Sequence, residues 1–147
     1  MKRLLIILLS FLTLSANAQT DSLEETKKEI YQFYVNLCQD ANKQLPLQVD
    51  EITTCYSVTF VNWTFTSKFK VLLSIDDLTD EEIAEIKKES YLLAKQNARR
   101  MLESGAYGTN RTDYRWLMKT LGLKYIRSYF DIDGNFLFAT TFDYNDF

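Results

Sequence analysis

The chain has 147 residues, of which 17 are basic and 20 acidic, for a formal net charge of −3, and none is histidine. This length suits one domain with its own core, and the acidic balance argues against nucleic-acid binding, which needs a concentrated basic footprint. The absence of histidine removes Ser-His-Asp and Cys-His catalysis, and two cysteines cannot build a Cys-rich zinc site. We therefore expect neither a cofactor nor a metal.

The first residues have the pattern of a secretory signal peptide. A basic start precedes an apolar run at residues 4–14 and a small-x-small cleavage site at residues 16–18. That run is too short to span a bilayer of about 30 Å as a helix. We expect a cleaved signal over residues 1–18 and a single periplasmic or secreted domain over residues 19–147. We expect no lipid anchor, because no cysteine directly follows the apolar run.

The domain begins with a predicted helix and a hairpin. Ser22 and Glu25 have capping-box spacing, and the apolar residues that follow have helical spacing until Pro46. From Thr53 the period changes to two, which predicts a hairpin that extends to residue 75 and turns at residues 61–63. This alternation groups the side chains of Tyr56, Val58 and Phe60 on one face.

Two further helices are predicted in the middle of the chain. Thr79 and Glu82 form a second capping box, and helical spacing continues from there to a stop near Gly105. A third helix is predicted over residues 112–121, with Gly122 in the glycine position that follows a helix.

The last element is a second hairpin around Asp133-Gly134, the strongest short hairpin signal. A two-residue loop at this dipeptide predicts three cross-strand pairs. These are Tyr129 with Phe138, Tyr125 with Phe142, and Lys124 with Asp143. The alternation groups the rings of Tyr125, Tyr129, Phe136, Phe138 and Phe142 on one face, and Ile126, Phe130, Leu137 and Ala139 on the other.

The element order α-β-β-α-α-β-β predicts an α+β fold. Its simplest architecture is a mainly antiparallel four-stranded sheet with the helices packed on one face.

The segment Asn42-Lys43-Gln44-Leu45-Pro46-Leu47-Gln48-Val49-Asp50-Glu51-Ile52-Thr53 resembles a signature of small exported proteins of Gram-negative bacteria, N-x-x-L-P-x-x-V-D-x-x-T. The resemblance implies a periplasmic α+β domain and transfers no catalytic residue. A cysteine pair typical of the second half of those proteins is absent here. Asp50 can cap the turn that enters the strand, and we favour this structural role over a binding role for Asp50, Glu51 and Thr53.

Cys38 and Cys55 are the two cysteines. In an oxidising compartment they could form a disulfide that joins the first helix to the sheet, which would contribute about 3 kcal/mol. The alternative is two buried free thiols that act as small apolar residues. The spacing leaves both open.

Several side chains are candidates for binding a protein partner. Arg111, Arg115 and Lys119 are four residues apart and form a cationic stripe on the third helix, which is either a solvated face or a contact for an acidic partner. The aromatic residues are abundant, and Trp63, Trp116, Tyr125, Tyr129 and Phe138 are the aromatic candidates, against the alternative that neighbouring elements bury them.

The sequence therefore favours a non-enzymatic exported binding protein, in its specific form an immunity protein or inhibitor of an exported toxin or cell-wall hydrolase. A carrier of a small apolar ligand, with a cavity between sheet and helices, is the alternative. An enzyme is third and would need two carboxylates in one cleft, one with a raised pKa.

Overall fold

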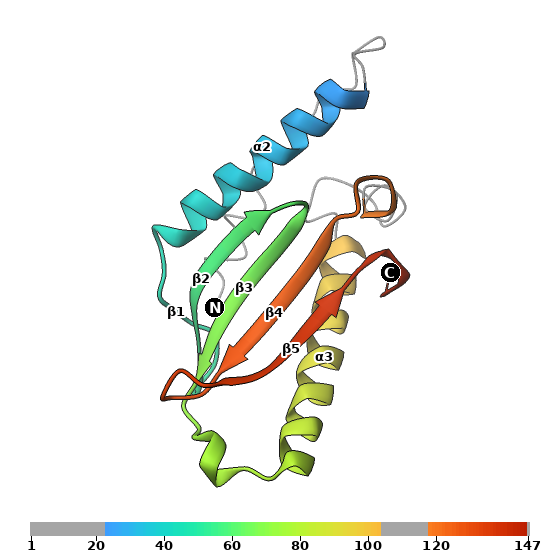
Figure 1. Ribbon diagram of the computed structural model, residues 1–147. Helices are drawn as coiled ribbons and strands as arrows, with labels where there is room; N and C mark the ends of the chain where they lie inside the picture. The colour runs from blue at the N-terminus through green and yellow to red at the C-terminus, as the bar shows by residue number, and fades with distance from the viewer. Residues whose placement is uncertain (1–22, 104–117, 147) are drawn as a thin grey trace.

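The computed structural model describes residues 23–103 and 118–146 (Figure 1). Two long helices accompany one sheet. The helices are α2 (Leu23–Asn42) and α3 (Asp80–Glu103), and the strands are β1 (Leu47–Gln48), β2 (Thr53–Val61), β3 (Thr64–Val71), β4 (Lys124–Phe130) and β5 (Phe136–Phe142). Short 3-10 turns, η1 (Ile75–Asp77) and η2 (Tyr144–Asp146), follow β3 and β5. The predicted signal peptide lies outside the described residues.

Both predicted long helices are present. The second capping box is formed, because the Thr79 backbone N–H donates to Glu82 Oε2 at 2.8 Å and the Glu82 N–H donates to Thr79 Oγ1 at 3.3 Å. The hydrogen bonds from Thr79 lower the pKa of Glu82. Residues 118–121 are helical and Gly122 has φ +69°, as expected at a helix end, while the rest of the predicted third helix lies outside the described residues.

The sheet has five strands in the order β1-β2-β3-β4-β5. The α+β class is confirmed, but the expected four-stranded and mainly antiparallel sheet is wrong in two respects. The short strand β1 adds an edge beside β2, and β3 pairs with β4 in parallel. A parallel neighbour requires a long crossover, which α3 supplies by carrying the chain from the end of β3 back toward the start of β4.

The first hairpin turns where predicted but contains an unpredicted bulge. Asn62 and Trp63 both have positive φ, +48° and +59°, which gives a two-residue turn between the paired residues Val61 and Thr64. The register shifts between Cys55 and Ser57, so Tyr56 is an extra residue in its strand. The bulge places Cys55 with Val58 and Phe60 in the core and leaves Tyr56 exposed, which corrects the predicted alternation.

In the second hairpin two deviations from the predicted geometry compensate each other. The loop has three residues, because the Asp131 N–H donates to the Asn135 carbonyl, and only Gly134 has positive φ. The register then shifts between Tyr129 and Phe130, which leaves Leu137 as the extra residue. The predicted pairs Tyr129–Phe138 and Tyr125–Phe142 are therefore confirmed. Lys124–Asp143 lies beyond the last paired residues and stays a prediction.

The bulge at Leu137 also moves the side chain of Phe136 to the other face of the sheet. Phe136 pairs with Phe130, so it lies on the same face as Phe130 rather than with Tyr125 and Tyr129 as predicted.

Both helices cover the same face of the sheet. A row of cross-strand partners on this face consists of Phe60, Phe65, Tyr125 and Phe142. Tyr34 of α2 stacks on Phe60 at one end of the row with a ring distance of 4.8 Å, and Tyr91 of α3 stacks on Phe142 at the other end at 5.1 Å. We call this the helix-covered face and its opposite the open face. The view in Figure 1 is onto the open face, with α3 behind β5.

Candidate protein-binding surface

Two residues of the segment with the sequence signature, Asp50 and Asn42, hydrogen-bond the backbone of neighbouring elements. The Asp50 carboxylate accepts the backbone N–H groups of Ile52 and Thr53 at 3.0 and 2.8 Å, which forms the expected turn into β2. Asn42, at the end of α2, donates its amide to the carbonyl oxygens of Cys38 and Val58 and accepts the Val58 N–H at 3.1 Å. Asn42 thus provides Val58 with the two hydrogen bonds that a neighbouring strand would make.

Most of the predicted aromatic candidates belong to the helix-covered face. Tyr129 and Phe138 are buried there and stack on each other at 4.6 Å, as in the alternative that neighbouring elements bury them. Tyr125 is half-buried, with its hydroxyl 2.9 Å from the Tyr34 hydroxyl. Trp63 is also half-buried and contacts Tyr31 of α2 edge to face at 5.4 Å. Tyr125 and Trp63 therefore help to hold α2 on the sheet.

Arg127 is a cation on this same face that the sequence analysis did not single out. It is the cross-strand partner of Ser67 and Thr140, and its Cζ lies 6.0 Å from the ring centre of Phe69 and 5.9 Å from that of Phe142. At such distances the ring faces attract a guanidinium group. Burial raises the pKa of Tyr129 nearby, and Arg127 opposes that rise.

The cationic stripe is only partly described. Lys119 is exposed, with its Nζ 5.8 Å from the centre of the Tyr144 ring. Arg111, Arg115 and Trp116 lie outside the described residues, so the stripe stays a prediction.

Both cysteines are buried and carry free thiols in this structure, Cys38 in α2 and Cys55 in β2. Burial raises the pKa of Cys38 to about 11 and also raises the pKa of Cys55. Protonated thiols react slowly, so the two residues behave as small apolar core side chains here. Their pairing under oxidising conditions remains a prediction.

The open face carries an aromatic cluster that the sequence analysis did not assemble. The Phe130 ring contacts Tyr56 at 6.2 Å and Phe136 at 5.8 Å, and Lys68 Nζ lies 6.0 Å from its centre. Tyr56 is 40% exposed and Phe136 56% exposed. We call Tyr56, Phe130 and Phe136 the open-face cluster. Both exposed members owe their position to a bulge, which explains why alternation alone did not group them.

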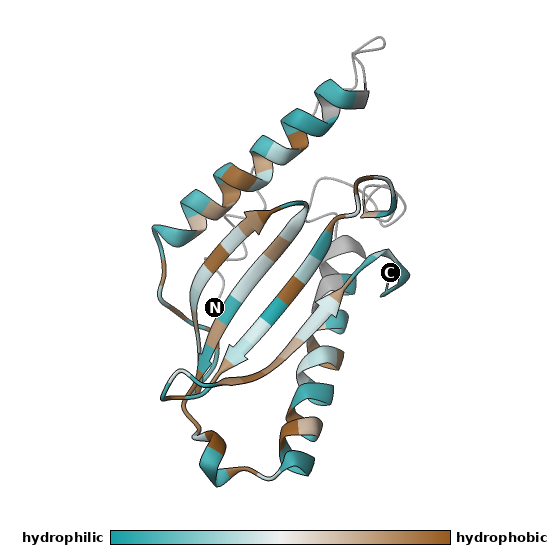
Figure 2. Cartoon of the chain, viewed as in Figure 1, coloured by the Kyte–Doolittle hydropathy of each residue, from teal (hydrophilic) through white to brown (hydrophobic). Residues whose placement is uncertain are grey.

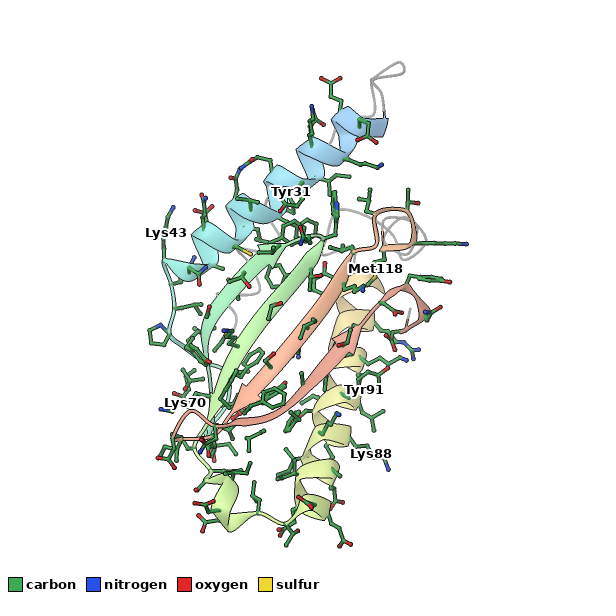
Figure 3. The ribbon with its side chains drawn as sticks, in the orientation of Figure 1. Tyr31, Lys43, Lys70, Lys88, Tyr91 and Met118 are labelled. Carbon is green, nitrogen blue, oxygen red and sulfur yellow. The ribbon has the colours of Figure 1, made fainter. Side chains whose placement is uncertain are left out.

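Further apolar side chains lie at the same end of the sheet. Leu72 follows β3 and is 52% exposed, and Ile132 follows β4 and is 45% exposed. The Ile132 N–H donates to the carbonyl of Leu73, which holds these two chain segments together. Lys70, labelled in Figure 3, is the cross-strand partner of Phe130. Figure 2 shows the resulting mixture of hydrophobic and hydrophilic positions along the strands. An exposed apolar area with such a polar surround is typical of an interaction site.

Asp131 anchors this end of the sheet. It is fully buried, and its carboxylate accepts the backbone N–H groups of Ile75, Asp133 and Asn135 and the side-chain amide of Asn135. Burial disfavours the charged form, but these hydrogen bonds outweigh it and lower the pKa of Asp131. The partners are all within the protein, so Asp131 fixes the loops beside the open-face cluster.

The carboxylates do not have the character of a catalytic pair. In the described part of the chain four carboxyl groups have shifted pKa values, and all four shifts are downward; they belong to Glu24, Glu82, Asp131 and Asp146. A general acid needs a shift in the opposite direction. Within residues 23–103 and 118–146, no three potential ligands gather as a metal site would require. Among the helices in these ranges, none has the length and apolarity to cross a membrane.

The chain matches no protein-family model, and no curated protein matches it significantly. It is similar in structure to the type 2 secretion system pilotin EpsS of Vibrio vulnificus, with a TM-score of 0.54, 10% identity, and coverage of 84% of this chain and 96% of that one. It is also similar to the type II secretion system pilotin AspS of Vibrio cholerae, with a TM-score of 0.51, 12% identity, and coverage of 86% and 100%.

At these identities the similarity establishes a shared fold. Both neighbours are pilotins of type II secretion systems.

Proposed function

We propose that this protein is an exported, non-enzymatic binding protein that holds a component of a secretion apparatus on the open face of its sheet. The observation that carries the proposal is the exposed open-face cluster with Leu72 and Ile132 beside it. Aromatic residues are the side chains that most often dominate protein interfaces. The fold similarity to two secretion-system pilotins supports a partner of this class.

An immunity protein or inhibitor would use the same surface with a toxin or hydrolase as its partner. The fold similarity favours the secretion component. The carrier alternative has less support, because it requires an enclosed space between sheet and helices. The structure instead has an open hollow at the edge of the sheet, between α3 and the strand residues 139–141.

A photo-crosslinking experiment tests the proposal. A benzophenone amino acid replaces Phe136 in the native cell, and a matched protein carries it at Leu93, which is 60% exposed on α3. We expect irradiation to crosslink position 136, but not position 93, to a secretion component identified by mass spectrometry. A second variant, Y56S/F136S, should reduce co-purification of that component at least tenfold while the circular dichroism spectrum stays unchanged.

Two outcomes would contradict the proposal. A crosslink from position 136 to an exported toxin or hydrolase would replace it with the inhibitor function. The absence of any position-specific crosslink would remove the open face as a binding surface.

A further inference from the structure

The outer edge of β5 is long and lacks the charged residues and prolines that normally keep a strand edge from pairing with another chain. β5 is the last strand of the sheet, and no strand among the described residues pairs with its outer side. Its seven residues, Phe136–Phe142, include no charged residue and no proline. The opposite edge is different, since β1 has two residues and directly follows Pro46. Natural edges are normally shortened or carry charges, because unpaired backbone groups recruit another strand.

A hollow of about 410 Å³ lies beside this edge, between β5 and α3. Ala84, Lys87, Lys88 and Tyr91 line its helix side, and residues 139–141 line its strand side. It is largely open to solvent, so it can admit a side chain of a partner but does not enclose a small ligand. Figure 3 shows Lys88 and Tyr91 on the stretch of α3 that passes β5. The small side chains at positions 84 and 139 leave the space that a partner's side chain could fill.

The wall of the hollow contains a polar group with an unmet bonding capacity. Thr140 is 4% exposed, and its hydroxyl makes no hydrogen bond within the described part of the chain. Native proteins pair nearly all buried hydroxyl groups, so this one calls for a specific explanation.

The charge of the hollow indicates the chemistry of its ligand. Lys87 and Lys88 are exposed, and neither forms an ion pair with a described residue, although Glu85 and Glu89 lie on the same helix. Lys88 also borders a second hollow together with those two glutamates. Two unpaired ammonium groups beside an open strand edge favour a segment that carries carboxylates.

We propose that the outer edge of β5 and the adjacent hollow bind an extended acidic segment of a partner protein by strand addition. The partner's backbone pairs with β5, its acidic side chains reach Lys87 and Lys88, and an alternate side chain enters the hollow. The hollow and the two lysines contain no residue of the open-face cluster, with which β5 shares only Phe136. Variants of the hollow and the lysines therefore test this site apart from the function proposed above.

Fluorescence anisotropy with defined peptides tests the proposal. The probes are labelled ten-residue peptides that alternate glutamate with valine, threonine, leucine or phenylalanine, and control peptides with lysine in place of glutamate. We expect at least one acidic probe to bind and the lysine peptides to bind at least tenfold more weakly. Methylation of alternate backbone nitrogens in the bound probe should abolish binding, because it removes the donors that pair with β5.

Three protein variants locate the site. K87E/K88E should weaken binding at least tenfold, whereas the matched adjacent pair on α2, K27E/K28E, should change it less than twofold. A84W fills the hollow from an exposed helix position and should also weaken binding at least tenfold. Hydrogen exchange of the wild-type complex should show new protection within residues 136–142.

The proposal is overturned if no acidic probe binds, or if K87E/K88E and K27E/K28E have equal effects. It is also overturned if protection appears on β2 or β3 instead of β5. Light scattering of the free protein gives a further check. A dimer in which β5 is protected from exchange would overturn the proposal, because the edge would then pair with a second copy of this chain.

Discussion

Asn42 is the residue at which α2 is joined most directly to the sheet. Its amide bonds the carbonyl oxygens of Cys38 and Val58 at 2.9 and 2.7 Å, and its carbonyl oxygen accepts the Val58 N–H. Val58 lies beyond the reach of β1, which pairs only with Cys55 and Thr54. One side chain therefore satisfies backbone groups of both a helix end and a strand.

Asn42→Asp should destabilise the protein by about 2 kcal/mol, because it removes both donated hydrogen bonds and sets a carboxylate against two carbonyl oxygens. The measurement is urea unfolding at pH 7. Asn36→Asp is the control on the same helix, where the side-chain oxygen contacts only Gln32 near the surface. The control should change the free energy of unfolding by less than about 0.5 kcal/mol. Equal effects of the two substitutions would show that the Asn42 bridge is not formed.

At the scale of elements, the attachment of α3 to the sheet depends on Tyr91. Its ring stacks on Phe142 with an interplanar angle of 3°, and its hydroxyl donates to Asp146 of η2. Lys95 adds an ion pair to the same carboxylate at 3.3 Å. Burial opposes the ionisation of Asp146, but the Tyr91 and Lys95 contacts prevail and lower its pKa.

Tyr91→Phe should lower the free energy of unfolding by about 1 kcal/mol, since it keeps the ring stack and removes only the hydroxyl. Tyr56→Phe is the matched control, because that side chain is exposed on the open face. Guanidinium unfolding of both variants measures the difference. A loss for Tyr56→Phe as large as that for Tyr91→Phe would contradict the assignment.

Sequence patterns predicted the positions of the helices and strands better than the sheet face on which each side chain lies. Capping residues act locally, so the end of α2 and the start of α3 followed from Pro46 and from Thr79 with Glu82, while Ser22 of the first capping box lies outside the described residues. A bulge moves every side chain beyond it to the opposite face of the sheet. No residue type in the sequence marks the bulge at Tyr56 or the one at Leu137. The aromatic candidates from the sequence therefore included the core residues Tyr129 and Phe138 and omitted Tyr56, Phe130 and Phe136.

Other features depend on partners distant in sequence. The parallel pairing of β3 with β4 and the position of β1 depend on contacts between segments far apart in the sequence, which no local sequence pattern contains.

The turn at Asn62-Trp63 is local, and its position was predicted. Its type was not, because tryptophan is an unusual residue at positive φ.

For the molecule as a whole, the absence of histidine predicts an unusual pH profile. No side chain has an ordinary pKa between about 5 and 8. Stability should therefore be flat from about pH 5.5 to 8, apart from the contribution of the α-amino group.

Stability should decrease on both sides of this plateau. Asp131 and Asp146 have lowered pKa values, so the stability they contribute is present above the ordinary carboxyl pKa of about 4 and is lost as the pH falls through their folded values. Cys38 and Cys55 have raised values, so their contribution is present below about pH 8.5 and is lost as the pH rises toward about 11, the folded value for Cys38.

Thermal unfolding between pH 3 and 11 measures this profile. Asp131→Asn should flatten the acid limb, and Cys38→Ala should flatten the alkaline limb. A steep change in melting temperature between pH 6 and 7 would contradict the profile.

The parallel seam between β3 and β4 has a consequence for how the chain assembles. Phe65 and its partner Tyr125 are separated by 60 positions, whereas each hairpin closes over a few residues. Distant pairings form slowly because a long loop must close before they gain any contact energy. The two hairpins should thus form early and meet late. Until they meet, Phe65 and Phe69 lack their neighbours on β4, so the half-assembled chain is the stage most prone to aggregation.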